Sequence, residues 1–166
     1  MRVLIAGSSG AIAEAVAKRM RDEGDYVFTL SRSGEPSATH CVADLTKPSS
    51  VEQVKAFVEK CGPLDAVFCG TGLLHGGWNM PEKSLSQLSM EWLQQNMLVN
   101  VQTHIHLAQA VEPLVKRSSP IKWVSLSAMV GSMEDNGLGG WYSYRMSKAA
   151  LNMFIRNLSI EWSRKA

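Results

Sequence analysis

The chain has 166 residues, of which 45% are hydrophobic and 19% are charged. This length suits one compact domain with its own core, and the composition excludes an intrinsically disordered chain. The formal net charge of +2 gives no broad basic field, so nucleic acid is not an expected partner, and no apolar run is long enough to cross a bilayer.

Short apolar runs alternate with helical stretches along the chain. In chain order the pattern predicts a strand at 2–7, a helix at 11–24, strands at 26–32 and 39–45, a helix at 47–62, a strand at 64–70, a long helix at 89–117, a strand at 121–127 and a final helix from about Trp141 to the end. Pro113 should kink the long helix or start a separate last turn. The alternation predicts a doubly wound (Rossmann) α/β fold with a parallel sheet of about five strands.

The three cysteines, Cys41, Cys61 and Cys69, are odd in number and lack the paired spacing of metal ligands. They are expected to be reduced thiols in a cytoplasmic protein. His104 and His106 stand two residues apart on a predicted helix and therefore point in different directions. We expect packing or surface histidines and no metal site.

A glycine-rich turn follows the first predicted strand and opens the first helix. In "IAGSSGAIAEA", Gly7, Gly10 and Ala13 stand at the spacing G-x-x-G-x-x-G/A. Small residues let the backbone approach a pyrophosphate closely. Unpaired backbone N–H groups and the helix dipole then stabilise the negative charge of the pyrophosphate. An ordinary tight turn is the alternative, but the position between strand and helix favours dinucleotide binding.

The end of the second predicted strand should select the cofactor. An acidic residue there would bind the ribose 2′-hydroxyl of NAD. The sequence "TLSRSGE" instead has Arg32, with no acid until Glu35. Arg32 could pair with the 2′-phosphate of NADP, with Ser31 and Ser33 as added donors, although a solvated arginine is the alternative. We therefore expect NADP(H), with NAD as the second choice.

"WYSYRMSKAALNMF" carries two tyrosines, but only Tyr144 has a lysine, Lys148, four residues on and thus on the same helix face. Ionising a tyrosine at neutral pH requires a pKa shift of roughly 3 units, or about 4 kcal/mol. A lysine at about 5 Å supplies about 3 kcal/mol at an effective dielectric constant near 20. Beside a nicotinamide, such a pair is a plausible acid/base for a carbonyl and an alcohol. Tyr142 is expected only to pack or to form the pocket wall.

Over its whole length the chain resembles the short-chain dehydrogenase/reductase family. The matching motifs, in family order, are "GSSGAIA", "ADLT", "FCGTGLL", "LVNVQ", "VSLSAMVGS" and "YRMSK". The stretch "GGWYSYRMSKAALNM" is most similar to the C-factor-like branch, which is linked to cell–cell signalling.

The resemblance implies roles for individual residues. Tyr144 would be the acid/base, Lys148 would hold the cofactor ribose and lower the tyrosine pKa, and Asn100 would bend its helix and hold a proton-relay water. A serine, here assigned to Ser127, would steady the substrate oxygen. Contacts to the cofactor are expected from Gly7, Ser9, Gly10, Ile12, Arg32, Asp44, Leu45, Gly70 and Lys148.

The cofactor end departs from the family pattern at two places. Ala11 and Ala13 stand where many members have glycine, and their methyl groups should narrow the approach to the pyrophosphate. Cys69 and Thr71 replace the asparagine and alanine of the N-x-A-G motif, so other hydrogen bonds must support that strand end.

The chemical end departs at the serine. The usual catalytic position is Ala128, and Ser127 beside it either substitutes or is a strand-end hydroxyl bonded to backbone. Losing a donor to the reacting oxygen can cost about 2.7–4 kcal/mol of barrier.

Family members usually continue with two more strands and a substrate cover. By the resemblance, the domain 1–166 is incomplete at its C-terminus, with strand order 3-2-1-4-5. The strand 121–127, which reads as buried, would then become an exposed apolar edge that invites association. The fragment should also be less stable and less soluble than an extended form, and should bind the adenine end better than it turns over substrate.

The expected function is hydride transfer between NADP(H) and a small-molecule carbonyl or alcohol. The alternatives are a catalytically weak dinucleotide-binding protein with a regulatory or signalling role, and a truncated product without a function of its own. An apolar substrate pocket is suggested by Leu73, Leu74, Trp78, Met80, Met133 and Trp141.

A homo-oligomer, either a dimer or a tetramer, is also expected, because in this family the long helix and the Tyr/Lys helix commonly pack against their copies. Met97, Leu98 and Val101 should face the sheet. The outer surface should include Ile105, Leu107, Met153 and Ile160.

Overall fold

The computed structural model describes residues 1–116 and 120–165. In chain order its elements are β1 (Arg2–Ala6), α1 (Ala11–Asp22), β2 (Tyr26–Ser31), β3 (His40–Val42), α2 (Ser50–Cys61), β4 (Ala66–Cys69), the 3-10 turn η1 (Leu85–Gln87), α3 (Met90–Met97), the π-helix η2 (Leu98–Gln102), α4 (Thr103–Val111), the 3-10 turn η3 (Glu112–Leu114), β5 (Lys122–Ser125), the 3-10 turn η4 (Met129–Gly131) and α5 (Tyr142–Lys165). No helix in these two ranges is long and apolar enough to cross a membrane.

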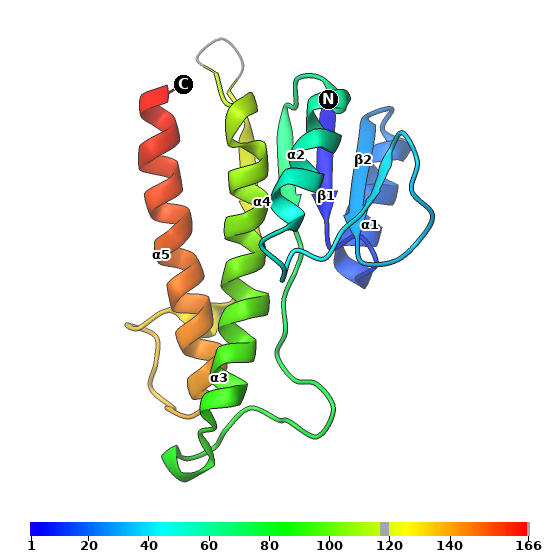
Figure 1. The fold of residues 1–166 in the computed structure, drawn as a ribbon. Helices are drawn as coiled ribbons and strands as arrows, with labels where there is room; N and C mark the ends of the chain where they lie inside the picture. The colour runs from blue at the N-terminus through cyan, green and yellow to red at the C-terminus, as the bar shows by residue number, and fades with distance from the viewer. Residues whose placement is uncertain (117–119, 166) are drawn as a thin grey trace.

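The strands form one parallel sheet in the order β3-β2-β1-β4-β5, as predicted. Leu4 of β1 lies opposite Phe28 of β2 on one side and Val67 of β4 on the other. All strands finish at the same edge, from which the loops 70–89 and 126–141 extend (Figure 1). Residues that follow different strands are therefore gathered at that edge.

Side chains of β1 alternate between the two faces of the sheet. Leu4 and Ala6 pack into the larger core with α2, α4 and Trp162 of α5. Val3 and Ile5 pack into the smaller core with α1. Figure 1 accordingly shows α1 on one side of the sheet and α2 and α4 on the other.

The predicted long helix at 89–117 is divided. α3 passes through the π-helix η2 into α4, and Pro113 lies in the separate 3-10 turn η3, which confirms one of the two expectations for this proline. The predicted C-terminal residue of this helix, 117, and the chain end, 166, lie outside the described residues. The expectation that Leu107 faces outward is wrong, because this side chain is completely buried in the larger core, where α4 packs against α2.

β5 is the last strand of the sheet in the described residues, so the expectation of an edge strand is confirmed. Val124 of this strand is 49% exposed, although its sequence context reads as buried. Met153 and Ile160 of α5 are exposed as expected, and the oligomeric state stays a prediction.

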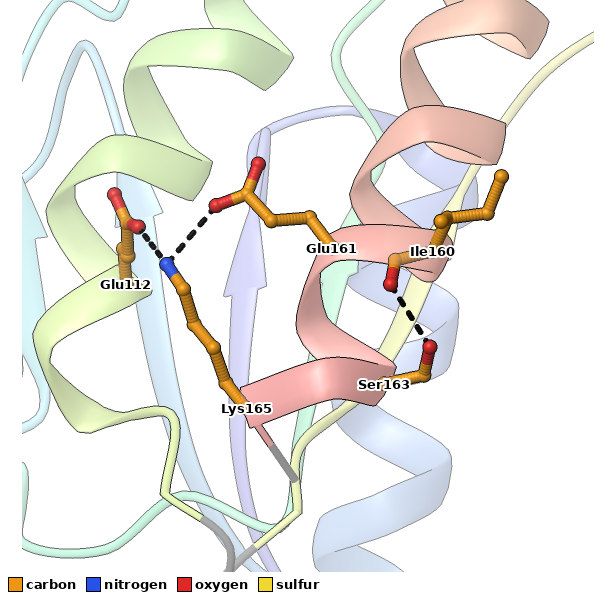
Figure 2. Close-up of polar contacts among 5 residues, drawn as sticks. All are labelled: Glu112, Ile160, Glu161, Ser163 and Lys165. Atoms are coloured by element: carbon orange, nitrogen blue, oxygen red, sulfur yellow. Dashed lines mark hydrogen bonds and ion pairs between the residues drawn. The ribbon is translucent and has the colours of Figure 1, made fainter.

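The last turn of α5 is connected by one ion pair to η3, the turn that follows α4. Lys165 pairs with Glu112 of η3 and, at 2.9 Å, with Glu161 one turn earlier (Figure 2). Exposed pairs of this kind contribute little to the free energy of unfolding. The buried ring of Trp162, in edge contact with Trp123 at 5.6 Å between ring centroids, is the stronger attachment of α5 to the sheet.

Candidate active site

A cleft of about 280 Å³ opens at the carboxyl ends of β1, β2 and β4. Most of the residues expected to contact a cofactor line it together. These are Gly7, Ser9, Gly10, Arg32, Asp44, Leu45 and Gly70.

The floor of the cleft is the turn between β1 and α1. Gly7 has a positive φ of 76°, and a Cβ added there would lie 3.0 Å from the backbone nitrogen of Thr71, so glycine is required. Gly10 is the N-cap of α1 and provides no side-chain cap for the first turn of the helix. The backbone N–H groups of that turn and the positive end of the helix dipole are therefore available for an anion.

Of the two alanines that stand where many family members have glycine, Ala11 is exposed at the start of α1 and only Ala13 is buried. Ala13 is buried, and its methyl group packs beneath Gly70, where an added Cβ would lie only 3.0 Å away. Its side chain thus serves helix–strand packing. The side chain of Ile12 is 61% exposed and lies on a separate patch of α1 with Val16 and Met20, so this residue could reach a cofactor only through its backbone.

Arg32 follows β2 directly and is exposed in the cleft. No ion pair of Arg32 occurs within residues 1–116 and 120–165. Ser31 also lines the cleft, and its buried hydroxyl donates to the carbonyl of Ser33 at 2.5 Å, so its role as an added donor stays a prediction. The ring of His40 approaches the same carbonyl at 3.0 Å, so β3 holds the Arg32–Gly34 turn in place.

Asp44 lies across the cleft from this turn. Its Oδ1 accepts hydrogen bonds from the hydroxyl of Thr46 at 2.7 Å and from the Thr46 N–H at 3.1 Å. The hydroxyl bond is the main reason that the pKa of Asp44 is lowered, and the charges of Lys47 and Arg32 lower it further. This compact turn ends the third strand at Val42, three residues earlier than predicted.

A chain of hydroxyl groups supports the end of β4, where the family motif has lost its asparagine. The Thr103 hydroxyl donates to the Val99 carbonyl at 2.7 Å, so the Thr71 hydroxyl donates to Thr103, also at 2.7 Å. The buried thiol of Cys69 lies 3.3 Å from the Thr71 hydroxyl, and burial raises the pKa of this thiol to about 11. The predicted alternative support therefore exists, and it comes from threonines.

Asn100 lies in the middle of the π-helix and is completely buried. Its Oδ1 accepts from the Leu73 N–H at 2.6 Å, and its Nδ2 donates to the Leu73 carbonyl at 2.8 Å and to the Ser147 hydroxyl at 2.9 Å. A π-turn widens the helix at a single point and often marks a functional site. Here it lets one amide connect the cleft loop after β4 to α5.

Tyr144 and Lys148 share one face of α5, as their spacing predicts. The Lys148 ammonium is 5.7 Å from the centroid of the Tyr144 ring and donates to the Leu126 carbonyl at 2.8 Å. Burial raises the pKa of the Tyr144 hydroxyl and lowers that of Lys148. The structure therefore presents Tyr144 as a protonated phenol, and the expected lowering of its pKa is not found.

Gly72 joins the two halves of the site. It lines the cleft, and a Cβ added to it would lie 3.5 Å from both the Lys148 Nζ and the Asn100 Oδ1. The glycine-rich turn and the tyrosine–lysine pair thus belong to one continuous site. Tyr142 is half-buried, and its hydroxyl has no hydrogen bond within the described residues.

Ser127 is exposed at the end of β5, and its hydroxyl donates to the Oδ1 of Asn152 at 2.5 Å. Asn152 stands two turns beyond Tyr144 on α5. The hydroxyl of Ser127 is therefore engaged away from Tyr144, by a side chain and not by the backbone. Ala128, at the position of the family serine, supplies no hydroxyl of its own.

His104 is completely buried and connects three segments of the structure. Its Nε2–H donates to the Thr71 carbonyl at 3.1 Å, so its Nδ1 accepts from the Ser125 hydroxyl at 2.9 Å, which in turn accepts from the Trp123 indole. Burial lowers the pKa of His104 to about 4. His106 contacts the Leu45 carbonyl at 2.7 Å, so both histidines have protein partners.

The His104 pKa predicts an acid-sensitive fold. An unfolded histidine has a pKa of about 6.5, so the unfolded chain binds more protons between that value and 4. We expect the free energy of unfolding to fall as the pH falls through this window, by on the order of 3 kcal/mol from this group. Urea titrations at pH 7, 5.5 and 4.5 measure it, and His104→Gln, although less stable, should show a shallower slope. Equal slopes would contradict the assignment.

Sequence reasoning missed two buried polar residues of the site. Ser147 lies between Asn100 and the Tyr144 carbonyl, to which it donates at 2.8 Å. Glu82 lies in the loop after β4, and its carboxylate meets the first turn of α5. The only sequence signal for Ser147 is its position directly before Lys148. No local pattern points to Glu82.

Proteins of one family share sequence with this chain over most of its length. The family model described as short chain dehydrogenase matches residues 1–166. The chain is 30% identical to 1-hydroxy-2-glutathionyl-2-methyl-3-butene dehydrogenase of Rhodococcus sp. (strain AD45), over 98% of this chain and 71% of that protein. It is also 30% identical to the benzil reductase ((S)-benzoin forming) IRC24 of Saccharomyces cerevisiae, over 96% of this chain and 65% of the relative.

C-signal of Myxococcus xanthus is 28% identical over 60% of this chain and 57% of its own length. The predicted similarity to that branch is therefore confirmed over part of the chain. Across these three relatives the match covers between 57% and 71% of the longer protein.

Solved structures share the fold at lower identity. A short chain dehydrogenase from Salmonella enterica serovar Typhi has a TM-score of 0.83 at 24% identity, with 98% of this chain and 71% of that chain covered. A short-chain dehydrogenase/reductase from Burkholderia multivorans with bound NADP has a TM-score of 0.76 at 23% identity, and the match covers 98% of this chain and 74% of that chain. An NADH-dependent reductase complexed with NAD has a TM-score of 0.79 at 22% identity, and the match covers 99% of this chain and 73% of that chain.

Proposed function

The chain belongs to the short-chain dehydrogenase family, and on that premise we propose that it is an oxidoreductase that uses NADP(H) to reduce a carbonyl compound to an alcohol. The observation that carries the proposal is the meeting of two sites at Gly72: the glycine-lined cleft on one side, and Lys148 with Asn100 on the other. One site suits a dinucleotide, and the other suits a proton donor.

The residues of the cleft fit the cofactor. The uncapped first turn of α1 would hold the pyrophosphate. Because Gly7 and Gly10 have no side chains, the pyrophosphate could lie close to the backbone of this turn. Arg32, exposed and without an ion pair in the described residues, would hold the 2′-phosphate, with Ser33 as a further donor. When bound, the nicotinamide supplies the hydride for the substrate carbon.

The protein's own contribution is the proton. Because burial raises its pKa, Tyr144 holds its proton at neutral pH and can donate it to the carbonyl oxygen as that oxygen gains charge. The ammonium group of Lys148 lies close to the ring of Tyr144, and its charge would stabilise the tyrosinate left behind. Asn100 and Ser147 fix the backbone of α5 against the cleft loop, so the two halves keep their alignment.

Arg32 provides the test of cofactor choice. We expect NADPH to bind more tightly than NADH, and Arg32→Asp to abolish or reverse the preference, by at least tenfold in the ratio of the two dissociation constants, because a carboxylate repels the 2′-phosphate and can accept from a 2′-hydroxyl. Fluorescence titration with both cofactors measures this. Arg21→Asp, on the far end of α1, is the matched control for charge.

Equal affinities in the unmutated chain, or a preference for NADH, would contradict the NADP(H) assignment. Turnover is tested separately by NADPH consumption with a panel of carbonyl compounds. Benzil is a suitable first member, because one relative is named for it.

A second candidate is dinucleotide binding with little turnover, in a regulatory or signalling role. Two observations favour it: Ala128 lacks a hydroxyl, and the Ser127 hydroxyl is engaged by Asn152. Saturable NADPH binding without consumption on any carbonyl compound would support this candidate over the first.

A further inference from the structure

Glu82 is a buried acid whose main-chain and side-chain atoms both hold the start of α5. It is 3% exposed, and no ion pair of Glu82 occurs in the part of the chain that the structure describes. Both carboxylate oxygens lie 3.3 Å from the Ser143 N–H, and the Ser143 hydroxyl donates to Oε1. The Glu82 carbonyl accepts from the Trp141 N–H at 2.5 Å.

A buried carboxylate without a cation is costly, so its retention needs a compensating partner. The N-terminus of the 24-residue helix α5 provides one, through free N–H groups and the positive end of the helix dipole. Ser143, completely buried, adds its hydroxyl as a charge-assisted donor.

The backbone leading into α5 is held in an unusual conformation at the same place. Gly139, Gly140 and Trp141 have positive φ values of 64°, 64° and 51° in succession. For tryptophan the left-handed region costs about 1–2 kcal/mol. A Cβ added to Gly140 would lie 3.1 Å from the Glu82 carbonyl oxygen, so glycine suits this close approach. The hydrogen bond from the Trp141 N–H to the same carbonyl then fixes the turn.

Tyr144 lies between the held residues and the rest of the helix. It directly follows Ser143 and is the third residue of α5. Its ring meets the edge of the Trp141 ring at 6.4 Å between centroids. The loop that carries Glu82 begins at Gly70 and Gly72 in the cleft. Glu82 therefore connects this cleft loop to the helix turn that carries the Tyr144 side chain.

Resting on the proposed function, we infer that Glu82 is a positioning residue for Tyr144: its carboxylate and carbonyl lock the first turn of α5 onto the cleft loop. It touches neither reacting atoms nor cofactor in this role. Its loss should therefore lower kcat while leaving cofactor affinity close to that of the unmutated chain.

Glu82→Gln and Glu82→Ala test this, with Glu134→Gln as the control, since Glu134 is an exposed acid in the loop before α5. We expect kcat to fall at least tenfold in Glu82→Ala and less in Glu82→Gln, whose amide oxygen still accepts from Ser143. The dissociation constant for NADPH should change less than threefold. In a Tyr144→Phe background, Glu82→Ala should add little further loss, because the group it positions is gone.

Hydrogen exchange of the variants gives a readout that needs neither cofactor nor turnover. Faster exchange confined to 70–89 and 141–147 in Glu82→Gln supports the inference, even if the unmutated chain shows no turnover and the proposed function fails. Unchanged exchange with unchanged kcat overturns it. Faster exchange throughout the sheet in both variants also overturns it, since Glu82 would then be a general stability residue.

Discussion

Tyr144→Phe should lower turnover of any carbonyl substrate by about 10²–10⁴-fold, the usual contribution of a positioned proton donor. The substitution removes one hydroxyl from a half-buried ring and leaves the edge contact with Trp141 in place. The fold and the affinity for NADPH should therefore stay close to those of the unmutated chain. Consumption of NADPH, together with a binding titration, separates the two effects.

Tyr142→Phe is the matched control, because it removes the same hydroxyl two residues earlier. Lys148 lies over the ring of Tyr144, and the Tyr142 hydroxyl has no hydrogen bond within the described residues. Only a small change in turnover is expected. A Tyr144→Phe variant with near-normal turnover, or a loss of similar size in Tyr142→Phe, would refute the assignment of the proton donor.

Asn100→Ala should produce the largest loss of stability among the site variants. The amide satisfies the N–H and the carbonyl of Leu73 and the hydroxyl of Ser147 in a completely buried position. Each buried group left without a partner costs about 1–3 kcal/mol, so we expect a loss on the order of 3 kcal/mol in the free energy of unfolding. At this chain length that corresponds to a fall in Tm of roughly 6–12 °C.

Urea or thermal unfolding measures the change. Asn157→Ala is the control, because Asn157 is exposed on α5 and should change the free energy of unfolding by less than about 0.5 kcal/mol. Asn100→Asp sharpens the test: it keeps the size but replaces a donor with an acceptor opposite the Leu73 carbonyl. If Asn100→Ala were as stable as Asn157→Ala, the connection between the cleft loop and α5 would contribute nothing to the free energy of unfolding.

The fold was readable from the sequence because its signals are local. The apolar run of β1 and the glycine turn after it predict a strand, a turn and a helix within a few residues, and Tyr144 and Lys148 share a face by helical geometry alone. Order in the sheet follows from the family resemblance and is confirmed.

The misses depend on contacts between distant segments. Leu107 reads equally well as an inward or an outward residue of a helix, and only the position of α2 decides it. Glu82 and Ser143 are 61 residues apart, so no local pattern could have paired them.

The central claim is that one cleft holds NADP(H) with its reactive end toward Tyr144 and Lys148. A crystal structure of this chain grown with NADP⁺ tests it most directly. The account predicts the 2′-phosphate within hydrogen-bond distance of Arg32, the pyrophosphate against the turn from Gly7 to Gly10, and the nicotinamide nearest Tyr144. A cofactor bound in the reverse orientation, bound elsewhere, or absent at saturating concentration would contradict it.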